Sequence, residues 1–290
     1  MSPKQEFIID FQITGRCNLN CPFCCGAIKS LSEVRTESLK IAIDKLVAVG
    51  ATTVVFTGGE PLLRKDIIEI IKHAYQKGLK IYLSTNGVSL LDHWQKIRLY
   101  LNCLGLPLDG SSSLRSKKMG RGRESYKAVI TILKFFKNNP PRSLIKVGTV
   151  VSKINKDDLI RIGTLLFKNS ELYHPDVWRL YQFSPLNYGT SVKWQHKITD
   201  KEFIELVQEV QTIFPGKKII PLSNTESNNS YIFISPNLKI ILLTNEKFVE
   251  IGDMQNFSTR ALREVLRKRQ KTIESGSHNR GWLFNIRRTY

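Results

Sequence analysis

The chain has no long apolar run. None of its hydrophobic stretches approaches the roughly 18 residues needed to cross a bilayer. The first residues, MSPKQEF, lack the basic and then apolar pattern of a secretory signal. These two absences predict a cytoplasmic protein with no membrane partner. The 290 residues are enough for one large core or two modest ones, and a hydrophobic content of 41% is ordinary for a globular protein.

Cysteine is scarce, with 5 residues in the chain and none after Cys103. So few thiols do not form the disulfide framework of a small secreted domain. Structural zinc sites commonly use two well-separated pairs of cysteine or histidine, and no second CxxC or HxxxH pair exists here. Cys103 lies in the apolar run LNCLGL and is predicted to be a core thiol.

Acidic residues are also few, because 25 Asp and Glu stand against 44 Lys and Arg, which gives a formal net charge of +19. Such an excess predicts an anionic partner, which would be a nucleic acid such as RNA, a phosphorylated small molecule or an acidic protein. A second interpretation stays open, in which surface lysines only keep the protein in solution.

Three of the cysteines are clustered. Cys17, Cys21 and Cys24 occur in TGRCNLNCPFCC, directly after the alternating segment EFIIDFQIT, which predicts a strand. Three thiolates can bind three irons of a 4Fe–4S cube and leave the fourth iron open to a small molecule. Cys25 could replace Cys24 as the third ligand. Adjacent side chains point apart, so we favour Cys24 and expect Cys25 to be a small buried neighbour.

Strands alternate with helices along most of the chain, which predicts an α/β fold with a parallel sheet and right-handed crossovers. The expected strands are residues 7–13, 52–57, 80–85, 102–108, 144–151 and 177–183. After Phe183 the pattern changes. The later elements are predicted to be a helix at 200–214, strands at 217–222 and 231–244 with a hairpin around Pro236 and Asn237, and a basic helix at 259–271.

The CxxxCxxC spacing resembles the signature of the radical S-adenosylmethionine (SAM) enzymes. The resemblance implies that the open iron binds the methionine end of SAM and that an electron from the cluster cleaves SAM to a 5′-deoxyadenosyl radical. It implies an electron donor such as flavodoxin or ferredoxin. It also implies a partial (β/α)6 barrel at residues 1–183, with the cysteine loop at the carboxyl ends of the strands. Residues 184–290 would be an α+β extension that covers the barrel mouth.

Two further motifs follow the second and third expected strands. Gly58 and Gly59 let the backbone approach a ligand closely, and Glu60 can accept a hydrogen bond from an ammonium group. By resemblance, the backbone of this GGEP motif holds the amino group of SAM. Ser84 and Asn86 are expected to reach the ribose or the carboxylate of SAM, although Asn-Gly also suits an ordinary tight turn.

Three more residues complete the expected SAM site. Phe23 occupies a position where the family usually has an aromatic residue. Asp109 could bond a ribose hydroxyl, or it could only cap a turn. Arg121, in MGRGRE, could bind the SAM carboxylate as the equivalent arginine does in some relatives, or it could be a solvated loop residue.

Lys146 and Arg179 are cations within otherwise apolar strands, IKVG and VWRLYQ. A buried cation is costly unless it faces a polar cavity. We therefore expect both residues to bind an anionic substrate inside the barrel. The alternative is that each side chain reaches solvent at a strand end.

Within the family, the chain is similar to the viperin-like branch, alongside the molybdenum-cofactor GTP cyclase. The likeness lies in GRG at Arg121, IKVG at Lys146, WRLYQ at 178–182 and NSY at 229–231. It implies chemistry on a nucleotide, with Tyr231 as the hydrogen donor that quenches a radical. Cys25 stands where viperins usually have Phe, and Val177 where they have an additional Arg.

Other functions stay open at this point. An RNA-modifying radical SAM enzyme would suit the net charge of +19. A peptide-modifying enzyme usually needs auxiliary clusters, and residues 184–290 contain no cysteine. A non-catalytic iron–sulfur protein would leave the GGEP motif without a use.

Overall fold

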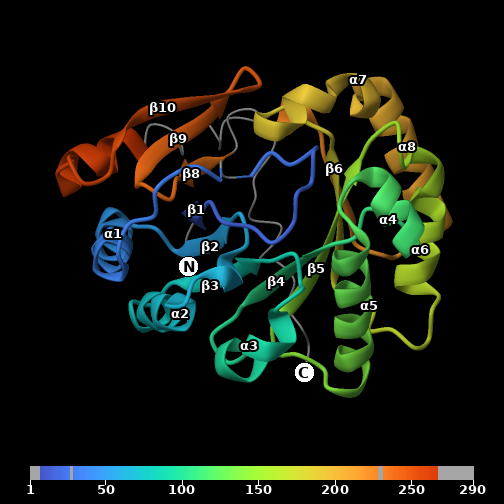
Figure 1. The fold of residues 1–290 in the computed structure, drawn as a ribbon, viewed down its shortest axis with the longest axis horizontal. Coiled ribbons are helices and arrows are strands. Elements are labelled where there is room, and N and C mark those ends of the chain that lie inside the picture. Colours follow the sequence, from blue (N-terminus) through green and yellow to red (C-terminus); the bar gives the residue numbers. More distant parts are fainter. Residues whose placement is uncertain (1–6, 27–28, 228–230, 267–290) are drawn as a thin grey trace.

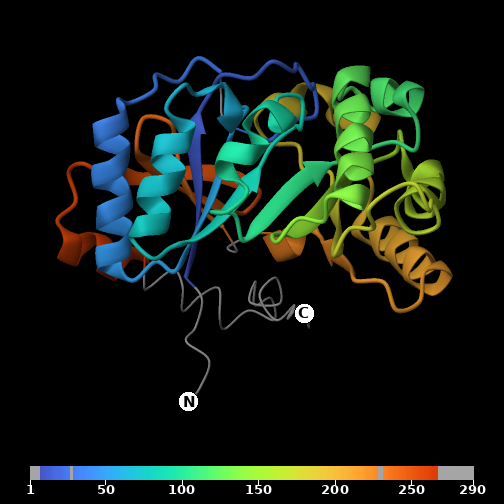
Figure 2. The same ribbon diagram turned by 90° about the horizontal axis from the view of Figure 1, so that it is seen from below.

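The computed structural model describes residues 7–26, 29–227 and 231–266. These residues form a 10-stranded sheet with the order β10-β9-β8-β1-β2-β3-β4-β5-β6-β7. Neighbouring strands from β1 to β7 are all parallel. The sheet is curved, and the helices between its strands cover its outer side (Figure 1). The same helices lie in front of the strands when the molecule is seen from below (Figure 2).

The strands are β1 (Ile8–Thr14), β2 (Thr53–Gly58), β3 (Lys80–Ser84), β4 (Cys103–Pro107), β5 (Leu144–Val151), β6 (Val177–Gln182), β7 (Ile219–Leu222), β8 (Ile232–Ile234), β9 (Lys239–Thr244) and β10 (Lys247–Asp253). The helices are α1 (Thr36–Val49), α2 (Ile67–Gln76), α3 (Leu90–Ile97), α4 (Ser113–Met119), α5 (Arg123–Asn138), α6 (Leu159–Phe167), α7 (Lys193–His196), α8 (Asp200–Ile213) and α9 (Asn224–Ser227).

The two faces of the sheet differ in chemistry, as β1 shows. Ile9, Phe11 and Ile13 are fully buried in the main core beneath the helices. Between them, Asp10 and Gln12 face a cavity on the inner side. Successive residues of a strand point to opposite faces, so one strand supplies both the core and the cavity wall.

The predicted α/β class and partial barrel are confirmed, and all six expected strands up to Phe183 are present. The short helix α4 was not predicted. The hairpin around Pro236 and Asn237 is confirmed as β8 and β9, which pair antiparallel. The strand β10 was not predicted, and the basic helix is described only over residues 259–266. None of the described helices is long and apolar enough to span a membrane.

The chain after Phe183 differs from the prediction in part. Its strands extend the sheet at both edges, because β7 pairs parallel with β6 and β8 pairs parallel with β1. Residues 184–196 lie against the cysteine loop. There the Asn187 amide donates to the carbonyl oxygen of Gly26 at 2.8 Å, and the Tyr188 hydroxyl accepts from the Lys29 amide at 2.8 Å. The division of the chain into residues 1–183 and 184–290 stays a prediction.

Candidate active site

The cysteine loop leaves the carboxyl end of β1. Cys17, Cys21 and Cys24 are all partly exposed on this loop and are free thiols. Backbone amides point at two of the sulfurs, with Leu19 N 3.4 Å from Cys17 Sγ and Gly26 N 3.2 Å from Cys24 Sγ. Amide hydrogen bonds to sulfur are among the interactions that tune iron–sulfur clusters.

Three cysteines on one loop suit a cluster that binds each thiol through its own iron. Over the described residues, no three Cys, His, Asp or Glu side chains converge on one metal position. In a 4Fe–4S cube each cysteine binds a different iron, so the thiols need not converge. Burial raises the pKa of Cys21 to about 11. The free thiol is therefore protonated at neutral pH, and iron binding has to release that proton.

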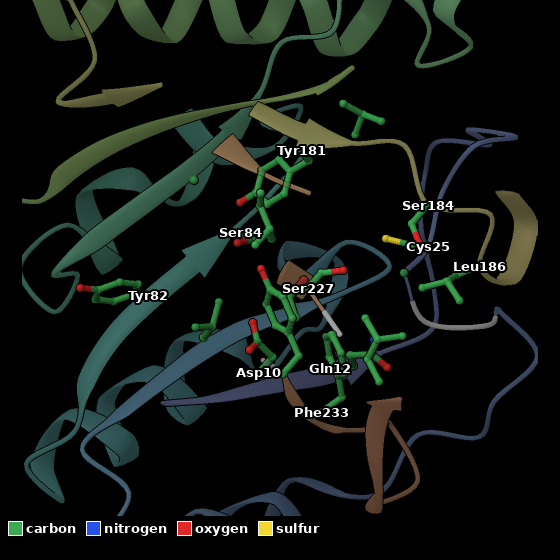
Figure 3. A pocket seen from close by; sticks show the side chains of 18 of the residues that line it. Asp10, Gln12, Cys25, Tyr82, Ser84, Tyr181, Ser184, Leu186, Ser227 and Phe233 are labelled. Atoms are coloured by element: carbon green, nitrogen blue, oxygen red, sulfur yellow. The ribbon is translucent and has the colours of Figure 1, made fainter. Parts of the chain in front are cut away.

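Cys25 is not the buried neighbour that we expected. It is exposed, and it lies on the wall of the inner cavity (Figure 3). The reason is its place at the end of the loop, where its backbone carbonyl contacts Asn187 of the covering segment at 3.2 Å. The side chain is left at the cavity opening.

The two glycines of the GGEP motif bring β2 against the start of the cysteine loop. Gly59 N donates to Thr14 O at 2.8 Å, and Glu60 N donates to Arg16 O at 2.7 Å. A Cβ atom on Gly59 would lie 2.2 Å from Arg16 O. Gly58 has a φ of 138°, and its Cβ would lie 2.3 Å from Thr14 O. Only glycine allows this backbone contact.

The Glu60 side chain joins two loops of the site. Its carboxylate is fully buried and accepts hydrogen bonds from Thr85 Oγ1 at 2.7 Å and Leu62 N at 3.1 Å. It also accepts from Asn86 N at 2.6 Å. Burial raises the pKa of Glu60, and the hydrogen bonds oppose that shift. The carboxylate thus holds the loop after β3 beside the loop after β2, while a contact between this motif and SAM stays a prediction.

The residues after β3 continue the same site. Asn86 donates from Nδ2 to Asn18 Oδ1 at 2.7 Å, which places its amide beside the cysteine loop. Its Oδ1 accepts from Val88 N at 2.9 Å, so the Asn-Gly turn is present as well. Ser84 lines the inner cavity.

Asp109 and Arg121 form a buried ion pair beside the cavity. One Asp109 carboxylate oxygen accepts from Arg121 Nε, and the other accepts from Val150 N at 2.7 Å. The Arg121 Cζ lies 5.1 Å from the ring centre of Phe23. Burial lowers the pKa of Arg121, but the adjacent Asp109 charge outweighs it, and the pKa is raised. Asp109 thus orients Arg121, and Arg121 lines the cavity.

The inner side of the barrel encloses a cavity of about 370 Å³. This volume is within the range of small-molecule sites. At one end the wall contains Phe23, Cys25 and Arg121 of the cysteine-loop side. The opposite end is formed by Tyr82 and Cys103. Figure 3 shows that side chains from strands far apart in the chain point into this space.

Lys146 and Tyr181 stand side by side in the cavity wall. The Lys146 Nζ donates to the Tyr181 hydroxyl at 3.3 Å. A Cβ on Gly105 would lie 3.1 Å from Lys146 Cε and 3.3 Å from Ser84 Oγ, so the lysine stem crosses over Gly105 toward β3. Arg179 is buried with its Cζ 5.7 Å from the Tyr181 ring, and it is not among the residues that line the cavity.

Other cavity residues were not singled out from the sequence. Tyr181, Asp10 and Gln12 all line the cavity. Tyr231, which the sequence analysis did name, lines it too. Asp10 and Gln12 carry a signal related to the one that identified Lys146, since each is a polar or charged residue within an otherwise apolar strand. The other two residues of NSY, at 229 and 230, lie outside the described residues.

We expect Ala substitution of Cys17, Cys21 or Cys24 to abolish cluster binding, because each thiolate binds its own iron. Anaerobically reconstituted wild type should contain about four irons per chain. Cys25→Ala and Cys103→Ala are the controls and should keep the wild-type iron content. Loss of iron in Cys25→Ala together with retention in Cys24→Ala would reassign the third ligand.

We expect Gly59→Ala to lower iron content, because the new Cβ would displace the carbonyl of Arg16 at the start of the loop. Overpacking of this kind typically costs about 1–3 kcal/mol. Gly216→Ala is the control, since nothing lies within 4 Å of its Cβ although its φ of 74° is strained. Iron content and melting temperature should be measured together. Equal iron content in both variants would contradict the role of this contact.

The comparisons with known proteins agree with this geometry. The radical SAM superfamily matches residues 11–166. An S-adenosylmethionine-dependent nucleotide dehydratase of Lacinutrix mariniflava is 26% identical over 96% of this chain and 58% of that protein. A protein of the same name from Flammeovirga pacifica is 26% identical over 79% of each chain. This chain thus spans little more than half of the first relative.

Solved structures share the fold at low identity. The anSMEcpe structure with bound AdoMet and Cp18Cys peptide has a TM-score of 0.65 at 16% identity, over 94% of this chain and 83% of that one. Streptococcus suis SuiB bound to S-adenosylmethionine has a TM-score of 0.63 at 15% identity, over 98% and 69%. The chain belongs to the radical SAM superfamily, whose enzymes use a 4Fe–4S cluster and S-adenosylmethionine for radical chemistry.

Proposed function

We propose that this radical SAM enzyme abstracts a hydrogen atom from a nucleotide, or from a related phosphorylated small molecule, held in the cavity beneath the cysteine loop. The observation that carries the proposal is the ammonium group of Lys146 inside that cavity. The names of the two relatives support a nucleotide as the substrate.

The ammonium group of Lys146 favours a negatively charged substrate. Lys146 is partly buried, and its Nζ contacts the Tyr181 hydroxyl. A cation held away from water is stabilised by an anion, and phosphate oxygens are strong acceptors. Arg179 lies behind the Tyr181 ring and adds positive charge to the same wall. A phosphate is therefore the group that we place here.

The cluster and SAM, when bound, supply a 5′-deoxyadenosyl radical. The chain's own residues hold the partners in place. Cys17, Cys21 and Cys24 would bind the cluster, and Arg121, held by Asp109, would bind a carboxylate at the cavity opening. An external reductant such as a flavodoxin or a ferredoxin would deliver the electron.

The position of the site inside the barrel favours a small substrate over RNA or a peptide. The cavity of about 370 Å³ lies inside the barrel, and residues 184–196 cover part of the cysteine loop. RNA would bind through many phosphates on an open basic surface. The absence of cysteine from residues 184–290 removes the auxiliary clusters that peptide-modifying enzymes usually have.

We expect Lys146→Met to weaken nucleotide binding by about tenfold to a hundredfold, because a charge-assisted hydrogen bond is lost. The variant keeps the apolar stem that crosses Gly105. Lys72→Met on the exposed face of α2 is the matched control and should bind like wild type. Calorimetry on the cluster-loaded protein measures the affinity.

Anaerobic turnover with SAM and dithionite then distinguishes the substrates. A nucleotide panel and a set of RNAs should be compared by the amount of 5′-deoxyadenosine formed. We expect a nucleotide to stimulate its formation with a weak dependence on salt. Stimulation by RNA alone, falling steeply as salt rises, would replace the proposal with RNA modification.

We further propose that the Tyr231 hydroxyl gives a hydrogen atom to the product radical, since Tyr231 lines the cavity directly before β8. The tyrosyl radical that is left would take one electron from the external reductant and one proton to restore the hydroxyl. Tyr231→Phe should still cleave SAM but form little product. Tyr75→Phe, on the exposed surface of α2, removes a hydroxyl elsewhere and is the control. Wild-type product yield from Tyr231→Phe would rule out this donor.

A further inference from the structure

An acidic side chain lies in the same cavity and has no part in the chemistry described so far. Asp10 is only 6% exposed, and it lines the cavity together with Gln12, two residues further along β1. A carboxylate that lines a cavity can accept hydrogen bonds from a ligand in addition to those it accepts from the protein, because its two oxygens offer about four acceptor positions. The phosphate that we place near Lys146 cannot be its partner, because like charges repel.

An aromatic wall stands beside Asp10. Phe233 of β8 is the Cα partner of Asp10 in the parallel pair of β1 and β8. Its ring stacks with that of Tyr231, with centroids 5.4 Å apart and planes 13° from parallel, and it meets Phe248 edge-on at 5.5 Å. All three rings line the cavity. Flat rings of this kind are the usual support for a nucleobase.

The acidic and basic groups belong to different walls. In the sheet, β2, β3 and β4 separate β1 from β5, which carries Lys146. Figure 3 shows Asp10, Gln12 and Phe233 close together on one side of the cavity, with Tyr181, the partner of Lys146, on another. A molecule with an anionic end and a flat, hydrogen-donating end matches this separation.

We propose that Asp10 reads the base of a guanine nucleotide, an inference that rests on the nucleotide substrate proposed above. An aspartate carboxylate only accepts hydrogen bonds. Guanine presents two adjacent donors, N1–H and the N2 amino group, and both can bond one carboxylate. Adenine and cytosine place an acceptor beside their amino group, and uracil has a single N–H between two carbonyls. Guanine is therefore the common base that a buried carboxylate selects.

The carboxylate has room for this contact even with a partner inside the protein. Its two oxygens offer about four acceptor positions, and the base edge needs two of them. Phe233 and Tyr231 would contact the flat part of the base, while Lys146 would bind the phosphates from the opposite wall.

The test compares GTP with two base analogues on the cluster-loaded protein, with SAM and without reductant, by calorimetry. ITP lacks the N2 amino group and should bind about tenfold more weakly than GTP. XTP places a carbonyl oxygen at that position and should bind more weakly still. In Asp10→Asn, the amide N–H can donate to that oxygen, so XTP should become the tighter ligand and GTP should lose at least about tenfold in affinity. Asp92→Asn, on the exposed surface of α3, is the matched control and should keep the wild-type order.

The results distinguish base recognition by Asp10 from nucleotide binding in general. Equal binding of GTP, ITP and XTP to wild type, or tighter binding of ATP, CTP or UTP than of GTP, would overturn base reading by Asp10 and leave nucleotide binding intact. Binding of none of them, with SAM still bound, would overturn the proposed nucleotide substrate as well. The wild-type comparison needs no variant, so equal binding would overturn the proposal even if Asp10→Asn fails to fold. An unchanged order of GTP, ITP and XTP in folded Asp10→Asn would assign the base contact to another residue and overturn the role of Asp10.

Discussion

The backbone contact between the end of β2 and the start of the cysteine loop is the constraint on which the rest of the site depends. Gly59 and Glu60 donate to carbonyls at the end of β1 and in the loop, at 2.8 Å and 2.7 Å. The Glu60 carboxylate then holds the loop after β3. Three strand ends are thereby fixed together by hydrogen bonds that any larger residue at Gly59 would break. The cysteine loop therefore begins at a backbone position that these hydrogen bonds hold in place.

The interior of the barrel tolerates charge because it is hollow. On the helix side of β1 every residue belongs to the apolar core, while the inner side carries Asp10 and Gln12. Lys146 occupies an equivalent position on β5, and its stem needs the missing side chain of Gly105. Polar groups on an inner face would destabilise a packed barrel. Here these polar side chains line a ligand-sized cavity instead of a packed interior, so the fold remains stable.

Most of the architecture could be predicted from local pattern, and the contacts between distant segments could not. The alternation of apolar segments placed β1 to β6, and the spacing of Cys17, Cys21 and Cys24 identified the loop. The ion pair of Asp109 with Arg121 joins two loops whose separation no sequence period encodes. The exposure of Cys25 and the pairing of β8 with β1 depend on where the chain after Phe183 returns, which short-range preferences do not determine.

The pairing of the late strand β8 with the early strand β1 also sets an order for biosynthesis. β1 ends at Thr14 and its neighbour β8 begins only at Ile232, so most of the chain is made between the two strands. Until then one edge of the sheet is unpaired, and the cavity lacks the wall that contains Tyr231 and Phe233. Contacts between such distant segments form late in folding. The cysteine loop and the strands that fix it come from the first part of the chain, so a cluster could be loaded before the substrate wall closes.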